Sequence, residues 1–168
     1  MSKVMIREAV MEDVPALEAL FKASYGELLK TDYPGPLLER ALPMLSKVNL
    51  GLIERGQFFV ALSMDGDLAG AGGWSYEPPG HGETVPGRAH IRHVAVSPKH
   101  TGRGVGRHII DHCRDHAGDI HILECFATLS AVRFYEKLGF EVLREFDVAL
   151  GGEIPFSSVH MLKDFRAN

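Results

Sequence analysis

One segment of this chain, residues 94–107 with the sequence VAVSPKHTGRGVGR, restricts the fold more than any other. It runs from an apolar strand through a glycine-rich turn directly into the start of a helix. The first backbone N–H groups of a helix have no partner inside it, and the helix dipole gives them partial positive charge. Glycines would let a phosphate approach these groups closely. The segment therefore offers an anion site, although such a turn can also serve only as a helix entry.

Two familiar phosphate-binding motifs do not fit this segment. It lacks the Gly-Lys-Ser/Thr ending of a P-loop, and no later glycine completes the dinucleotide pattern Gly-x-Gly-x-x-Gly. Nucleotide hydrolysis and hydride transfer therefore lose support.

Hydrophobic periodicity predicts one mixed sheet with helices packed on it. Patterns typical of strands cover residues 4–8, 57–64, 68–76, 90–96, 120–126 and 142–150, and a last strand ends near residue 163. Patterns typical of helices cover residues 13–28, 37–45, 103–117 and 130–138, and Pro43 weakens the second of them. Residues 77–87 form a loop rich in proline and glycine. Because no segment looks like a linker, we expect one α/β domain over residues 1–168.

Composition narrows the class of protein. The chain is 45% apolar, which is ample for one core, and its formal charge of −4 with scattered basic residues argues against a nucleic-acid partner. No apolar run reaches the length of a signal peptide or a membrane span, so we expect no membrane partner and a cytoplasmic location. The two cysteines, Cys113 and Cys125, lack the spacing of a disulfide framework or a zinc knuckle. We expect both to be small buried apolar residues.

Three histidines, His108, His112 and His116, recur at helical spacing and raise the question of a metal site. The same helix can bury an apolar face made of Val105, Ile109, Ile110, Cys113 and Ala117, which would leave the histidines on the solvated side. We therefore expect no metal.

The glycine-rich turn resembles the acyl-coenzyme A signature of the GNAT superfamily of N-acetyltransferases, Arg/Gln-x-x-Gly-x-Gly/Ala. Thr101 stands at its first position, Gly104 at the fourth and Gly106 at the sixth. Residues 123–140, LECFATLSAVRFYEKLGF, and residues 5–9, MIREA, are also similar to GNAT segments. Thr101 departs from the usual Arg or Gln, but this changes a side chain and not the backbone amides. The resemblance spans nearly the whole chain and implies a single GNAT-like domain, with a mixed, mostly antiparallel sheet flanked by helices.

For function, the resemblance implies transfer of an acetyl group from acetyl-coenzyme A to a primary amine, by direct attack in a ternary complex and without a metal. The turn amides would hold the pyrophosphate, and the strand before them would pair with the pantetheine arm and stabilise the oxyanion. The cofactor-binding residues implied in this way are Val94, Ala95, Val96, Gly102, Arg103, Gly104, Val105, Gly106, Arg107, Thr128 and Ala131.

Tyr135 matches the family's usual general acid, which protonates the departing thiolate, although it could also be a packing residue. The acceptor amine must also lose a proton. His90 is our first candidate for the base and Glu77 the second, with a water chain as a rival. By alternation, His90 and Arg92 share one face of their strand and His93 points to the other, unless a bulge alters this assignment.

Several alternatives stay open from sequence. The chain could be a non-catalytic acyl-coenzyme A-binding module, or it could use another acyl-coenzyme A donor. The acceptor could be a small-molecule amine or a protein amino group, and we expect residues 33–47 and 75–88 to shape its pocket. A homodimer is also open.

Overall fold

The computed structural model describes residues 3–80 and 82–166, and in these residues seven strands form one sheet in the order β1-β2-β3-β4-β5-β7-β6. Neighbouring strands are antiparallel except β4 and β5, which are parallel. The prediction of a mixed, mostly antiparallel sheet is confirmed. The strands are β1 (Val4–Glu8), β2 (Phe58–Ser63), β3 (Leu68–Ser75), β4 (Arg88–Val96), β5 (Ile122–Thr128), β6 (Glu141–Leu150) and β7 (Ile154–Asp164).

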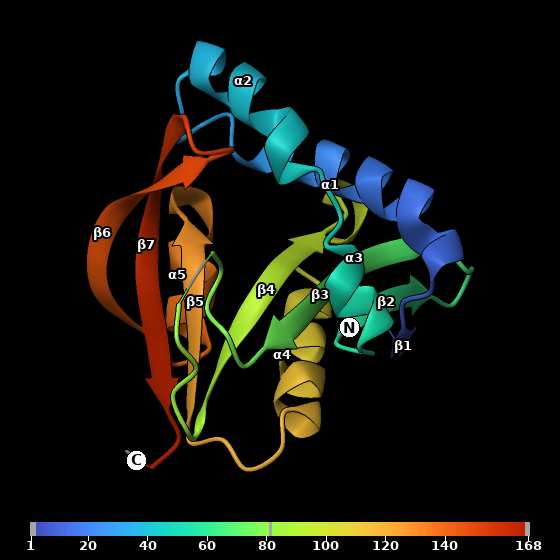
Figure 1. Cartoon of the computed structure of the whole chain (residues 1–168). Helices are drawn as coiled ribbons and strands as arrows, with labels where there is room; N and C mark the ends of the chain where they lie inside the picture. The colour runs from blue at the N-terminus through green and yellow to red at the C-terminus, as the bar shows by residue number, and fades with distance from the viewer. Residues whose placement is uncertain (1–2, 81, 167–168) are drawn as a thin grey trace.

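Helices cover both faces of this sheet (Figure 1). One face carries α1 (Val14–Leu28), α2 (Gly35–Leu45) and α3 (Leu50–Glu54), and the other carries α4 (Val105–His116) and α5 (Val132–Lys137). Helix α2 continues past Pro43, which the sequence had suggested as a point of weakness. Helix α3 was not predicted. It begins where the Asn49 side chain accepts a 3.3 Å hydrogen bond from the Leu52 amide, which satisfies one of its free N–H groups.

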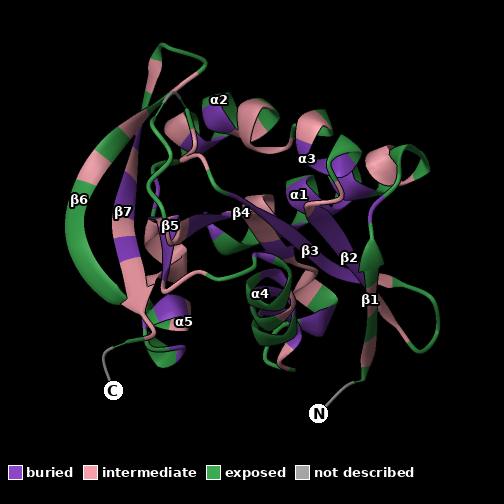
Figure 2. Cartoon of the chain, turned by 60° about the horizontal axis from the view of Figure 1, so that its bottom comes forward, coloured by how far each residue is buried: buried purple, intermediate pink, exposed green. Residues whose placement is uncertain are grey.

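Alternation along β2 divides the core between the two faces. Phe58 and Val60 pack with α1 and α3, whereas Phe59 and Ala61 pack with the α4 side. The central strands are buried while β6, at the edge, is largely exposed (Figure 2). Burying a phenylalanine of this kind contributes about 1.5–3 kcal/mol, so the two layers fix the sheet between the helices.

A β-bulge in β4 breaks the alternation that we assumed from sequence. Ala71 of β3 pairs with Ala95, but Gly73 pairs with Arg92, so β4 has one more residue than β3 over this stretch. His93 lies in the bulge with a φ of 57°. Our placement of His93 by strict alternation was therefore wrong: its ring stacks on Phe21 of α1, with centroids 3.9 Å apart.

Strands β4 and β5 pair only at their starts and then separate. Their described residues pair only from Arg88 to His90 on β4, opposite Ile122 to Glu124 on β5. Past these pairs the two strands leave backbone groups without a ladder partner between them. An opening in the middle of the sheet follows.

The two cysteines are buried free thiols, as predicted. Burial raises the pKa of both, which keeps them protonated. Of the three histidines of α4, His108 and His116 are exposed, as expected, whereas His112 is half-buried because it packs edge-on against Phe59 with ring centroids 4.5 Å apart. In the described part of the chain, no three His, Cys, Asp or Glu side chains could together hold a metal ion. Nor does any described helix combine the length and apolar character needed to cross a membrane.

Candidate functional site

A cavity of 580 Å³ opens where β4 and β5 separate. Its walls come from β4, the glycine-rich turn, the start of α4, the end of β5 and helices α1 and α5. Arg103 is the one predicted cofactor-binding residue outside this lining, and it is exposed. The predicted residues that line the cavity are Val94, Ala95, Val96, Gly102, Gly104, Val105, Gly106, Arg107, Thr128, Ala131 and Tyr135.

The backbone of the turn requires its glycines. Gly102 and Gly104 have φ values of 75° and 81°, in the left-handed region that side chains disfavour. Gly104 is the N-cap residue directly before α4, and a Cβ on Gly106 would lie 2.7 Å from the Phe134 ring. The Thr101 hydroxyl donates to the Pro98 carbonyl at 3.3 Å. The threonine that replaces the usual Arg or Gln of the signature thus makes a hydrogen bond within the turn. The first amides of α4 stay available for an anion.

The separated strands suit a ligand that is long and carries amides. Such an arm can pair with unpaired backbone groups as an added strand does. Tyr25 of α1 reaches this opening, where its hydroxyl donates to the Val94 carbonyl at 3.3 Å. Sequence reasoning missed Tyr25, because it lies beside the apolar stripe of its helix and no motif marks it. Together, the turn and the opening fit acetyl-coenzyme A, with its pyrophosphate and extended pantetheine arm.

Tyr135 lies in the wall of the same cavity. Its ring packs against Phe134 and Phe140, with centroids 5.0 and 5.3 Å away. Burial raises its pKa well above the usual value, and the nearby Cys125 and Tyr25 raise it further. A phenol of this kind keeps its proton at neutral pH, so it can act only as a proton donor.

His90 is not among the residues that line the cavity, but it directly precedes Ile91, which is. The His90 ring is buried, and its Nε2 lies 3.5 Å from Glu124 Oε2. Burial lowers the pKa of His90, and the Glu124 charge opposes this while nearby cationic groups add to it. The net result is a neutral imidazole at neutral pH, which can accept a proton.

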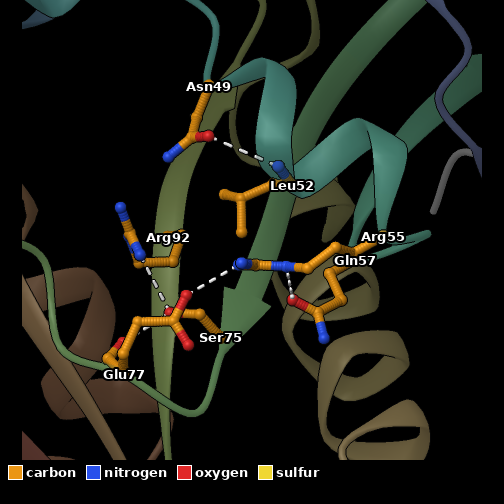
Figure 3. Close-up of polar contacts among 7 residues, drawn as sticks. All are labelled: Asn49, Leu52, Arg55, Gln57, Ser75, Glu77 and Arg92. Atoms are coloured by element: carbon orange, nitrogen blue, oxygen red, sulfur yellow. Dashed lines mark hydrogen bonds and ion pairs between the residues drawn. The ribbon is translucent and has the colours of Figure 1, made fainter. Parts of the chain in front are cut away.

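Glu77 is held in an ion pair away from the cavity. Its carboxylate accepts a 2.7 Å hydrogen bond from Arg55, and its backbone carbonyl accepts one from Ser75 at 2.6 Å. Arg92 donates to the same Ser75 hydroxyl at 2.9 Å, and Figure 3 shows these side chains pointing toward one another. Burial alone would raise the pKa of Glu77, but the hydrogen bonds and the two arginine charges lower it. A paired carboxylate with a lowered pKa is a weak base.

One family model covers the part of the chain that builds the cavity. The sequence model of the acetyltransferase (GNAT) family matches residues 18–140. Streptothricin acetyltransferase from Streptomyces lavendulae is 32% identical over 87 residues, which make up 49% of this chain and 43% of that protein. The match thus spans less than half the length of this relative.

Two solved structures share the fold over almost the whole chain. A GCN5-related N-acetyltransferase from Rhodopseudomonas palustris has a TM-score of 0.78 and 24% identity, covering 98% of this chain and 97% of that one. The PaiA N-acetyltransferase from Thermoplasma acidophilum, solved with coenzyme A, has a TM-score of 0.73 and 18% identity, covering 96% and 99%. At these identities the likeness concerns the fold. Because the family model matches most of the sequence, this chain belongs to the acetyltransferase (GNAT) family.

Proposed function

We propose that this protein transfers an acetyl group from acetyl-coenzyme A to a primary amine, by direct attack in a ternary complex. One observation carries the proposal. A single cavity joins the amides of the glycine-rich turn, the opening between β4 and β5, and the buried phenol of Tyr135. An anion site, a pairing edge and a proton donor are the three parts that acyl transfer from coenzyme A requires.

Acetyl-coenzyme A supplies an activated acetyl group, held as a thioester. The backbone amides of residues 102–107 would hold its pyrophosphate, with Arg107 adding positive charge at the cavity wall. Residues 94–96 would pair with its pantetheine arm through backbone groups, and Thr128 and Ala131 would close the far side. Apolar side chains on the cavity walls would exclude water from the reacting group.

Two residues would move the protons. His90 would take one proton from the acceptor ammonium and leave a neutral nitrogen. A bond from this nitrogen to the acetyl carbon then forms, the carbon–sulfur bond breaks, and the amine gives up its second proton to solvent, from which Tyr135 later regains the proton that it donates. Tyr135 would donate its hydroxyl proton to the sulfur, which leaves as a thiol. The products are an acetylated amine and coenzyme A.

Streptothricin acetyltransferase, by its name, acetylates a small molecule, which favours a small-molecule amine over a protein amino group. The residues that we expect to shape the acceptor pocket, 33–47 and 75–88, include residue 81, which lies outside the described residues.

Turnover of acetyl-coenzyme A over a panel of amines tests the proposal. The panel should hold small mono- and polyamines, amino acids, streptothricin, and peptides with a lysine or a free amino terminus. We expect release of free thiol together with an acetylated product seen by mass spectrometry. Coenzyme A binding without turnover of any amine would instead support the non-catalytic binding module. Turnover with succinyl-coenzyme A alone would assign a different acyl donor.

A further inference from the structure

A buried carboxylate lies between two histidines on the sheet, outside the lining of the acyl-donor cavity. Glu124 of β5 has 7% of its side chain exposed, and its oxygens face His90 on β4 and His160 on β7. The distances are 3.5 Å from Oε2 to His90 Nε2 and 2.7 Å from Oε1 to His160 Nε2. A buried charge is costly without such partners, so this arrangement demands an explanation.

The register of the sheet brings these groups together. His90 and Glu124 form the last pair of the short parallel ladder before β4 and β5 separate. His160 pairs with Phe126, two residues further along β5, so it reaches the carboxylate diagonally. The carboxylate therefore lies at the point where the opening between the strands begins.

The two ring nitrogens of His90 have different surroundings. Nε2 faces the carboxylate of Glu124, whereas Nδ1 is buried and has no hydrogen-bond partner within the described residues. A carboxylate favours the tautomer that carries the proton on the nitrogen facing it. This leaves the lone pair of Nδ1 free. A buried acceptor without a donor is costly, and the N–H of an acceptor amine would supply the missing donor.

We infer that Glu124 is the positioning residue of His90, an inference that rests on the proposed function. Glu124 keeps the ring proton of His90 on Nε2 and stabilises the imidazolium that forms when Nδ1 takes a proton from the acceptor. In that step the ammonium N–H bond breaks, an Nδ1–H bond forms, and the Nε2–H bond is kept. His160 and Arg88, the latter 3.6 Å from Glu124 Oε2, hold the carboxylate in place.

The charges around His90 give the direction of the expected effect. Burial and the charges of His160, Arg92 and Arg88 lower the pKa of His90, whereas Glu124 raises it. Glu124→Gln removes the one opposing negative charge and keeps the shape of the side chain. The pKa of His90 should therefore fall further in this variant.

Titration of the His90 ring by NMR, in the protein without substrate, tests the pair directly. We expect Glu124→Gln to lower the His90 midpoint by about one unit or more. The matched variant Glu39→Gln, at an exposed position of α2, should leave the midpoint unchanged. In the wild-type protein, ring nitrogen shifts above the midpoint should show the proton on Nε2. A proton on Nδ1 or an unmoved midpoint would overturn the inference. The position of the proton is measured in the wild-type protein, so this test does not depend on the folding of a variant.

Kinetics on an active amine then test the role. In Glu124→Gln, kcat should fall about tenfold or more, and the acid limb of kcat/KM should move to lower pH with the ring midpoint. The dissociation constant of acetyl-coenzyme A should not change, and Glu124→Asp, which keeps the charge, should recover part of the shift. A loss of rate with an unmoved acid limb would make Glu124 merely structural and overturn the role. Absence of acetyl transfer would contradict the proposed function instead. The ring titration would still show whether Glu124 controls the pKa of His90.

Discussion

The hydroxyl group of Tyr33 donates a 2.6 Å hydrogen bond to the carbonyl oxygen of Ser157, which ties the segment between α1 and α2 to β7. The same hydroxyl accepts a 2.8 Å hydrogen bond from the Leu129 amide, directly after β5. Burial raises the pKa of Tyr33 to about 12. One buried phenol thus joins three separate parts of the chain beside the cavity.

Tyr33→Phe should lower the free energy of unfolding by about 1–3 kcal/mol, because the Leu129 amide and the Ser157 carbonyl both lose a partner. The stacking on Phe156, with centroids 4.3 Å apart, should survive. Urea denaturation measures the change. The matched control is Tyr76→Phe, because the Tyr76 hydroxyl also bonds a backbone carbonyl but the residue is 43% exposed. Equal losses in the two variants would contradict the importance of burial at Tyr33.

Arg107→Glu should weaken coenzyme A binding by about tenfold or more, since tenfold corresponds to about 1.4 kcal/mol and the change places a carboxylate beside the proposed pyrophosphate site. Arg107 is exposed in the first turn of α4 and lines the cavity, so its replacement should not disturb the core. Isothermal titration calorimetry with coenzyme A measures the affinity.

The control for this measurement is Arg40→Glu, which makes the same charge change on an exposed face of α2, outside the cavity. We expect its affinity to stay within about twofold of the wild type, because exposed charges at a distance are screened by salt. Equal weakening in both variants would point to net charge and not to the turn.

Local sequence predicted the cavity's glycine-rich wall well. The requirement for a positive φ at Gly102 and Gly104 is a property of the residue type, so the turn and the start of α4 can be inferred without tertiary contacts. The continuous apolar run along β2 likewise fits a strand that is buried on both faces.

Features that depend on distant partners could not be predicted in this way. The bulge at His93 depends on its pairing with β3 and on the Phe21 ring beneath it. Helix α3 is short and has little periodicity of its own. The partners of Glu124 come from strands that only the sheet order brings together. The sequence therefore did not show that this glutamate is buried between two histidines.

Acid should destabilise the protein through His93. Burial lowers the pKa of His93 to about 4, the Leu45 carbonyl opposes this at 2.7 Å from Nε2, and Arg92 adds to it. Below a pH of about 6.5, His93 binds a proton in the unfolded chain but not in the folded one. The stability that is present above that pH is therefore lost as the pH falls toward 4. The difference between a pKa of about 6.5 and one of about 4 corresponds to a loss of at most about 3 kcal/mol. Contact of the ring with the cavity reduces this loss.

Unfolding free energies of the wild type and His93→Gln, measured from pH 7.5 to 4.5, check this expectation. Glutamine keeps a donor for the Leu45 carbonyl but does not titrate, so the variant should lose less stability over this range. Parallel curves for the two proteins would mean that His93 is not responsible.

Tyr135→Phe gives the most direct test of the acid step. The change removes the hydroxyl and leaves the ring to pack against Phe134 and Phe140, so stability and coenzyme A affinity should change little. General acid catalysis contributes about 10²–10⁴-fold in rate, and kcat on an active amine should fall by that order. If Tyr135→Phe turns over as fast as the wild type, the thiolate takes its proton from solvent, and the raised pKa of Tyr135 reflects burial alone.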